Sequence, residues 1–166
     1  MSLTPHDISV PVFTRTLKAL DAILAKAEAH AEARKIDPTV FLQARLAPDM
    51  FPLTRQVQIA CDFAKGASAR LAGAEVPSWP DDEKTFAELR ARIGRTLDFI
   101  ATLPAQAFAG AETREITIMM RGEPRSFDGR TYLLHNVLPN FFFHAATAYD
   151  ILRHNGLEIG KRDFIG

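Results

Sequence analysis

Features that mark secreted, membrane-spanning or nucleic-acid-binding proteins are scarce in this sequence. Cys61 is its only cysteine, so no internal disulfide can form, which fits a reducing compartment. The 20 basic and 20 acidic residues balance, so no charge excess favours nucleic acid or a membrane surface. No stretch approaches the roughly 18 to 20 uninterrupted apolar residues of a membrane helix, and no apolar block precedes Lys18 as in a signal peptide. We therefore expect a cytoplasmic protein that binds neither nucleic acid nor membrane.

The residues that are present suit a single helical domain. A chain of 166 residues has about the usual size of one domain and can bury a core without disulfide or metal support. Hydrophobic residues make up 47% of it, an ordinary share for a globular protein. Apolar residues recur at helical spacing in four segments. These segments are residues 6–33, 48–73, 82–103 and 128–155. We expect residues 1–166 to form one domain.

Individual residues predict where the helices end and bend. Gly73 suits the position after the second helix, and Asp81 or Asp82 can cap the third. Pro139 lies inside the fourth helix and should kink it, because proline lacks the backbone N–H that the helix needs. Residues 38–47 are expected to be a short connecting helix or turn. We expect the tail, residues 157–166, to be irregular and to dock on the bundle.

Residues 112–127 differ from the helical segments. A short β-branched run over residues 115–120 is followed by a turn at 121–124. The simplest interpretation is a small β-hairpin between the third and fourth helices. A strand pair of this size is not stable alone, so it should pack on the bundle.

The fourth helix carries apolar residues on two faces. On a helical wheel Asn140 and several apolar residues fall within about 60° of His144, so this stripe should face the core. Phe142 and Tyr149 fall on the far side. A helix that is apolar on both faces is central or is covered by a partner, which indicates a homodimer contact. The alternative is that the hairpin and the tail cover this second face.

Three other residues have plain structural interpretations. Cys61 has no basic neighbour that would lower its thiol pKa, and it is expected to be a core or boundary cysteine. Asp62 is expected to pair with Arg70 or Arg153. Trp79, in a proline-containing loop, is expected to anchor that loop on the rim of the bundle or to line a pocket mouth.

The last helix resembles that of DinB-like proteins. His144 is followed twelve residues later by Gly156, with Leu152-Arg153 shortly before it, as in that superfamily. Residues 156–164 and 51–64 resemble more narrowly the uncharacterised DUF1993 family, whose order of segments matches nearly the whole chain. The resemblance implies an all-α fold, a DinB/YfiT-like four-helix bundle in up-down-down-up order, with the small β-hairpin before the last helix.

The wider superfamily often binds a divalent metal through three histidines. One lies on the second helix and two lie on the fourth at H-x-x-x-H spacing. In this chain His144 takes the second position of that pair, Asn140 takes the first, and Gln56 falls near the second-helix position. Amide oxygens are poor ligands for zinc or nickel. The resemblance therefore implies a degenerate metal site, in which His144 is the one matching ligand and two of three expected histidines are absent.

Several interpretations of His144 stay open. It could be a buried neutral histidine hydrogen-bonded to Asn140 and Gln56. With those two residues it could instead line a small-molecule pocket or act as a general base. It could also hold a divalent metal, zinc or nickel.

Three functions follow from these interpretations. The first is a small-molecule-binding bundle protein with a pocket between the second and fourth helices. The second is a non-catalytic, dimeric interaction or stress-response module. The third is a metal-dependent enzyme similar to the thiol transferases of the superfamily. The sequence alone leaves open whether the chain is an enzyme.

Overall fold

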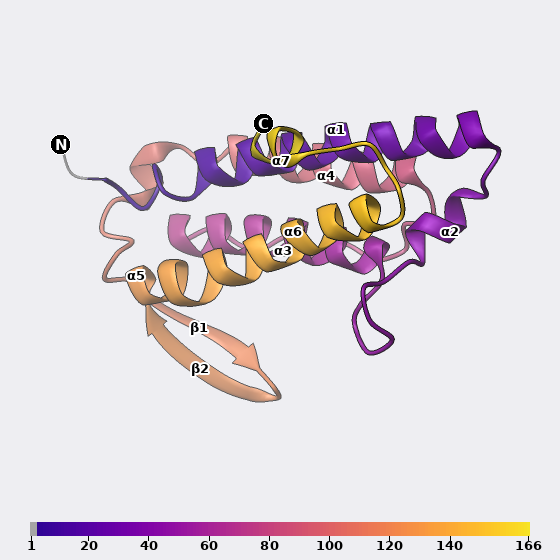
Figure 1. Ribbon diagram of the computed structural model, residues 1–166. Helices are drawn as coiled ribbons and strands as arrows, with labels where there is room; N and C mark the ends of the chain where they lie inside the picture. Colours follow the sequence, from indigo (N-terminus) through magenta and orange to yellow (C-terminus); the bar gives the residue numbers. More distant parts are fainter. Residues whose placement is uncertain (1–2) are drawn as a thin grey trace.

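Four long helices form a bundle in the computed structural model, which describes residues 3–166 (Figure 1). They are α1 (Val10–Arg34), α3 (Leu53–Ala72), α4 (Phe86–Ala101) and α6 (Leu138–His154). The shorter elements are α2 (Pro38–Leu42), η1 (Ala105–Phe108), β1 (Glu115–Met120), β2 (Glu123–Asp128), α5 (Gly129–Thr131), η2 (Tyr132–Val137) and α7 (Lys161–Ile165). A helical bundle with a hairpin before its last long helix is therefore confirmed.

The core lies between the four long helices. α3 packs along both α4 and α6, and α1 closes the bundle against the same two helices. Phe13 of α1 and Phe141 of α6 meet edge to face with ring centroids 4.8 Å apart, and both are fully buried. Burial of such large apolar side chains is the main stabilising contribution to the fold. None of the helices in residues 3–166 combines the length and apolar character needed to cross a bilayer.

Three helix starts differ from the prediction, and the first of these is α1, which begins at Val10 rather than near residue 6. α3 begins at Leu53 rather than near residue 48, because Pro52 is extended and residues 43–52 form a loop. α4 begins at Phe86, after Thr85. The Thr85 hydroxyl accepts from the Glu88 N–H at 3.1 Å, and the Glu88 carboxylate accepts from the Thr85 N–H at 3.0 Å. This reciprocal capping box, and neither predicted aspartate, satisfies the N–H groups at that helix end.

The last helix is long and irregular where proline predicts it. Asp128 caps its start by accepting from the Thr131 N–H at 2.8 Å. Helical structure then runs through α5, η2 and α6, and η2 is a π-helical stretch that ends two residues before Pro139. Since Pro139 cannot donate a backbone hydrogen bond, the wider π turn accommodates the interruption.

The hairpin lies where the sequence predicts it, and its turn is shorter than predicted. β1 and β2 are antiparallel, with Met120 opposite Glu123. Only Arg121 and Gly122 lie between the strands, and both have positive φ (53° and 86°), as a two-residue type I′ turn requires. Ile116 is 4% exposed and belongs to the core, which confirms that the hairpin packs on the bundle.

The tail is more ordered than predicted. Residues 161–165 form α7, which lies along α1 (Figure 1). The Arg15 guanidinium donates to the Ile165 carbonyl at 2.8 Å. Phe164 packs on Tyr149 with ring centroids 5.7 Å apart, so the tail covers part of the second apolar face of α6. Phe142 on that face stays 38% exposed.

Candidate functional site

The packing of α3 on α6 brings His144 against Gln56. The His144 Nδ1 atom lies 2.7 Å from Gln56 Oε1, and Gln56 is 1% exposed. The Gln56 amide nitrogen donates to the Phe51 carbonyl at 3.0 Å, which fixes the orientation of the amide. Because Oε1 can only accept, Nδ1 carries the proton, and Nε2 keeps a lone pair in the neutral ring.

The environment of His144 favours that neutral ring. Burial lowers the pKa of His144 below its usual value of 6.5, and the positive charge of Arg55 lowers it further. Both effects disfavour the imidazolium form. At neutral pH the side chain is therefore a neutral imidazole with one acceptor atom.

The acceptor atom of this imidazole faces outward. Among residues 3–166, no atom forms a hydrogen bond with Nε2. Three other side-chain atoms of these residues are buried without a hydrogen-bond partner, and Nε2 is not among them. Those atoms are Ser68 Oγ, Arg92 Nε and Asn136 Oδ1. A buried Nε2 without a partner would belong to that set, so Nε2 of the half-buried His144 reaches the solvent.

Aromatic rings surround the imidazole. The ring of Phe63 is nearly parallel to that of His144, at 18° and 6.1 Å between centroids. Phe143 meets His144 edge to face at 5.2 Å and is itself 56% exposed. We call His144, Gln56, Phe63 and Phe143 the His144 site. It offers a polar acceptor atom, Nε2, beside two apolar rings.

Asn140 does not join this arrangement. Its amide nitrogen donates to the Asn136 carbonyl at 2.7 Å, one turn back on the same helical stretch. No hydrogen bond links it to His144 or Gln56 in the part of the chain that the structure describes. The structure therefore brings together two of the three predicted residues, and the use of all three for a ligand stays a prediction.

The donor atoms of the His144 site do not fit a resident zinc or nickel ion. Within residues 3–166, no three His, Cys, Asp or Glu side chains converge as metal ligands would. His144 Nδ1 is occupied by its hydrogen bond to Gln56, and the neighbouring amides are poor ligands for these metals. The chemistry of the site is therefore derived from the protein side chains.

A second polar cluster, which the sequence analysis missed, lies between α3 and α4. Arg92 is fully buried and pairs with Asp62 at 2.9 Å, Asp81 at 2.8 Å and Glu83 at 3.0 Å. Asp62 also pairs with Lys65 at 2.9 Å. The predicted pairing of Asp62 with Arg70 or Arg153 is therefore wrong.

The position of Arg92 could have indicated this cluster. It lies at helical spacing among buried residues of α4 such as Leu89 and Ile93. A buried arginine needs carboxylate partners, and three acidic residues, 81–83, precede the helix. A charged residue inside an apolar helical stripe is therefore the sequence feature that indicates this buried cluster.

Trp79 and Cys61 have structural roles that agree with their interpretations. Two cations contact the Trp79 ring, with Lys65 Nζ 4.4 Å and Arg95 Cζ 4.3 Å from its centroid. These contacts anchor the loop before α4. Cys61 is fully buried, and burial raises the pKa of its thiol to about 12, so it is not a nucleophile at neutral pH.

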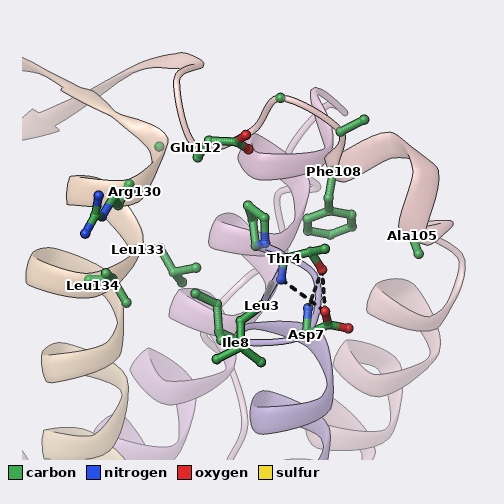
Figure 2. A pocket seen from close by; sticks show the side chains of 14 residues that line it. Leu3, Thr4, Asp7, Ile8, Ala105, Phe108, Glu112, Arg130, Leu133 and Leu134 are labelled. Carbon is green, nitrogen blue, oxygen red and sulfur yellow. Dashed lines mark hydrogen bonds between the residues drawn. The ribbon is translucent and has the colours of Figure 1, made fainter. Parts of the chain in front are cut away.

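A large hollow lies at the end of the bundle and shares no residue with the His144 site. Its volume is about 820 Å3. The N-terminal segment, η1 with the following loop, and α5 with η2 form its walls (Figure 2). Phe108 and Leu133 lie at its apolar surface, and Asp7, Glu112 and Arg130 add charge. No sequence motif points to it, because its three walls are far apart along the chain.

The bundle, the hairpin before its last helix, and the histidine that faces α3 define a DinB-like protein. A crystal structure described as a DinB family member from Shewanella denitrificans is similar, with a TM-score of 0.91 and 45% identity over 97% of this chain and 91% of that chain. The model of a domain of unknown function, DUF1993, matches residues 6–165. The chain belongs to the DUF1993 family. No curated protein matches it.

Proposed function

We propose that this protein binds a small organic molecule at the His144 site without a resident metal. The observation that carries the proposal is the 2.7 Å contact between His144 Nδ1 and Gln56 Oε1, which turns Nε2 outward as an acceptor. A ligand with an O–H or N–H group would donate to Nε2. The packing of α3 on α6 supports the proposal, because it holds His144 against Gln56.

The surround of Nε2 favours a ligand with a flat apolar body. Phe63 and Phe143 present ring surfaces beside the imidazole, and aromatic rings pack well on other planar groups. Arg55 also lies nearby, with its guanidinium paired to the Asp81 carboxylate and 6.0 Å from the centre of the exposed Phe51 ring. A planar molecule with a hydroxyl group suits the ring surfaces and the Nε2 acceptor. The same neutral imidazole could accept a proton from such a group as a general base.

Phenol and anisole test this proposal as a matched pair, since anisole lacks the hydroxyl hydrogen. We expect phenol to shift the backbone amide signals around His144 in NMR titrations and to bind roughly 2- to 10-fold more tightly than anisole, the worth of one hydrogen bond. His144→Phe should remove the preference for phenol, and His154→Phe, at the exposed end of α6, should keep it. Equal binding of both probes to the wild-type protein would contradict the proposal.

A homodimer is a second candidate function, supported by the aromatic surface of α6. Phe142 is 38% and Phe143 is 56% exposed, although α7 covers Tyr149. Exposed aromatic side chains are typical of protein interfaces. Sedimentation equilibrium of the wild type and of Phe142→Glu tests this candidate. A dimer in the micromolar range that Phe142→Glu dissociates is expected, and a wild-type monomer across that range would exclude it.

A further inference from the structure

We infer that the hollow at the end of the bundle is a second ligand site, which takes an amphiphilic amine. The site is independent of the proposed function at the His144 site. Its volume of about 820 Å3 lies in the range of about 300–1,000 Å3 that is usual for small-molecule pockets. Three segments distant in sequence enclose it, as Figure 2 shows.

The inner surface of the hollow is apolar and well anchored. Phe108 and Leu133 are almost fully buried and support this surface, while the half-buried Ile8 and Leu134 and the exposed Leu3 present the apolar area that a ligand can reach. His6 packs edge to face on Phe108 with ring centroids 5.2 Å apart, so this ring is held in place. Apolar surface left at a fixed hollow gains free energy when a ligand removes it from water.

The backbone on two sides keeps the hollow open. Gly129 lies so close to the loop after η1 that a Cβ atom there would be 1.8 Å from the Ala111 carbonyl oxygen. The Arg130 N–H donates to the Glu112 carbonyl at 3.0 Å, which ties α5 to that loop. These contacts fix the spacing of two walls, so the protein need not rearrange to admit a ligand.

The N-terminal wall of the hollow is held in place by hydrogen bonds within its own turn. Thr4 donates to the Asp7 carboxylate from its backbone N–H at 3.1 Å and from its hydroxyl at 2.7 Å. These hydrogen bonds lower the pKa of Asp7, so its carboxylate is charged at neutral pH. A negative charge therefore lies at the N-terminal side of the hollow.

The charges around the hollow select the sign of the ligand. Figure 2 shows the Asp7 carboxylate below Phe108, the Glu112 carboxylate above it and the Arg130 guanidinium on the opposite wall, so the two carboxylates and one guanidinium leave the lining with a net negative charge. Among the residues that line the hollow, none makes a hydrogen bond to the Glu112 carboxylate. An ammonium group beside Asp7, with its apolar body on Ile8 and Leu134, matches this net negative lining.

Two probes with one body and opposite charge test the inference: 4-phenylbutylamine and 4-phenylbutyrate. We expect NMR titration of the full chain with the amine to shift the signals of Phe108 and Leu133, and the amine to bind at least about fivefold more tightly than the carboxylate. Higher salt should weaken binding of the amine, because the charges at the rim of the hollow are exposed and therefore screened. Equal affinity of the two probes would overturn the inference.

Variants test the hollow and its charge separately, and they distinguish this site from the His144 site. Ala109→Trp, at an exposed lining position, should fill the hollow and abolish binding, while its circular dichroism spectrum stays that of the wild type. Glu112→Gln should weaken binding of the amine severalfold. Glu158→Gln, at an exposed position outside the hollow, should leave that binding unchanged. His144→Phe should leave amine binding unchanged. Undiminished amine binding by Ala109→Trp would refute the site.

Discussion

Arg92 shows how one residue can organise a connection between helices. Its side chain is fully buried, and it is balanced by three carboxylates, two of which come from the loop before α4. Burying charge without partners is costly, so the arginine and the loop depend on each other. The polar cluster therefore holds the loop between α3 and α4 in one position.

Removing the Arg92 charge should destabilise the protein strongly. We expect Arg92→Met to lower the free energy of unfolding by about 3–5 kcal/mol, because it leaves Asp81 and Glu83 without their buried partner. Arg95→Met, which loses a cation–π contact to Trp79, should cost no more than about 1 kcal/mol. Urea denaturation measures both. A loss for Arg92→Met that does not exceed that of Arg95→Met would contradict the role of the cluster.

The His144 side chain makes stability depend on pH. Its pKa is lowered in the folded state, so the unfolded chain binds more protons once the pH falls below about 6.5. The contribution of the neutral imidazole is thus complete above that pH and is lost as the pH falls toward the folded-state pKa. Urea denaturation at several pH values from 7.5 downward should show this loss, and His144→Phe should reduce it. An unchanged pH profile in His144→Phe would contradict the shift.

The sequence predicted which face His144 occupies, but not every partner on that face. Helical spacing puts Asn140 beside His144, and Gln56 falls at the matching position of α3. The choice between hydrogen-bond acceptors is made by side-chain rotamers. Asn140 finds the Asn136 carbonyl on its own helix, so only Gln56 meets the histidine. Periodicity holds no information about that choice.

Helix boundaries depend on individual hydrogen bonds more than on pattern. The apolar spacing predicts α4, but an aspartate such as Asp81 or Asp82 is as good a cap by residue type as the threonine that forms it. Thr85 and Glu88 stand in the spacing of a capping box and form it. Asp81 instead faces Arg92, since a buried cation is the stronger requirement.

The capping box gives a prediction at the scale of one helix. We expect Thr85→Ala to lower the free energy of unfolding by about 0.5–2 kcal/mol, because the Glu88 N–H loses its acceptor. Asp82→Ala should have a much smaller effect, since Asp82 is exposed and is not the cap. Thermal and urea denaturation of the two variants measure the difference. A larger loss in Asp82→Ala would show that the aspartate caps the helix after all.

At the scale of the whole molecule, local patterns predicted the bundle but not its hollow. Four helical stripes, a β-branched run and the likeness to DUF1993 were enough for the architecture. The hollow arises where residues 3–8, 105–112 and 129–134 meet, and no single segment carries a pattern for it. Close backbone approach at Gly129 is likewise a property of the folded chain. Tertiary spacing of this kind is invisible to helical periodicity.

The two proposed sites lie at different places along the bundle. The His144 site lies between α3 and α6, where the superfamily pattern would put metal ligands, and the hollow lies at the end where the N-terminal segment meets α5 (Figure 1). At the first site Gln56 accepts a hydrogen bond from His144, in a position where the resemblance to the superfamily implies a histidine. Ligand binding by a neutral imidazole is therefore the central claim.

Long-range proton–nitrogen NMR of the His144 ring at pH 7 tests this claim most directly, with His144→Phe used to assign the signals. We predict a neutral ring that is protonated on Nδ1 and bare on Nε2, and that is unchanged by one equivalent of zinc. A charged ring, a proton on Nε2, or coordination shifts on addition of zinc would contradict the claim.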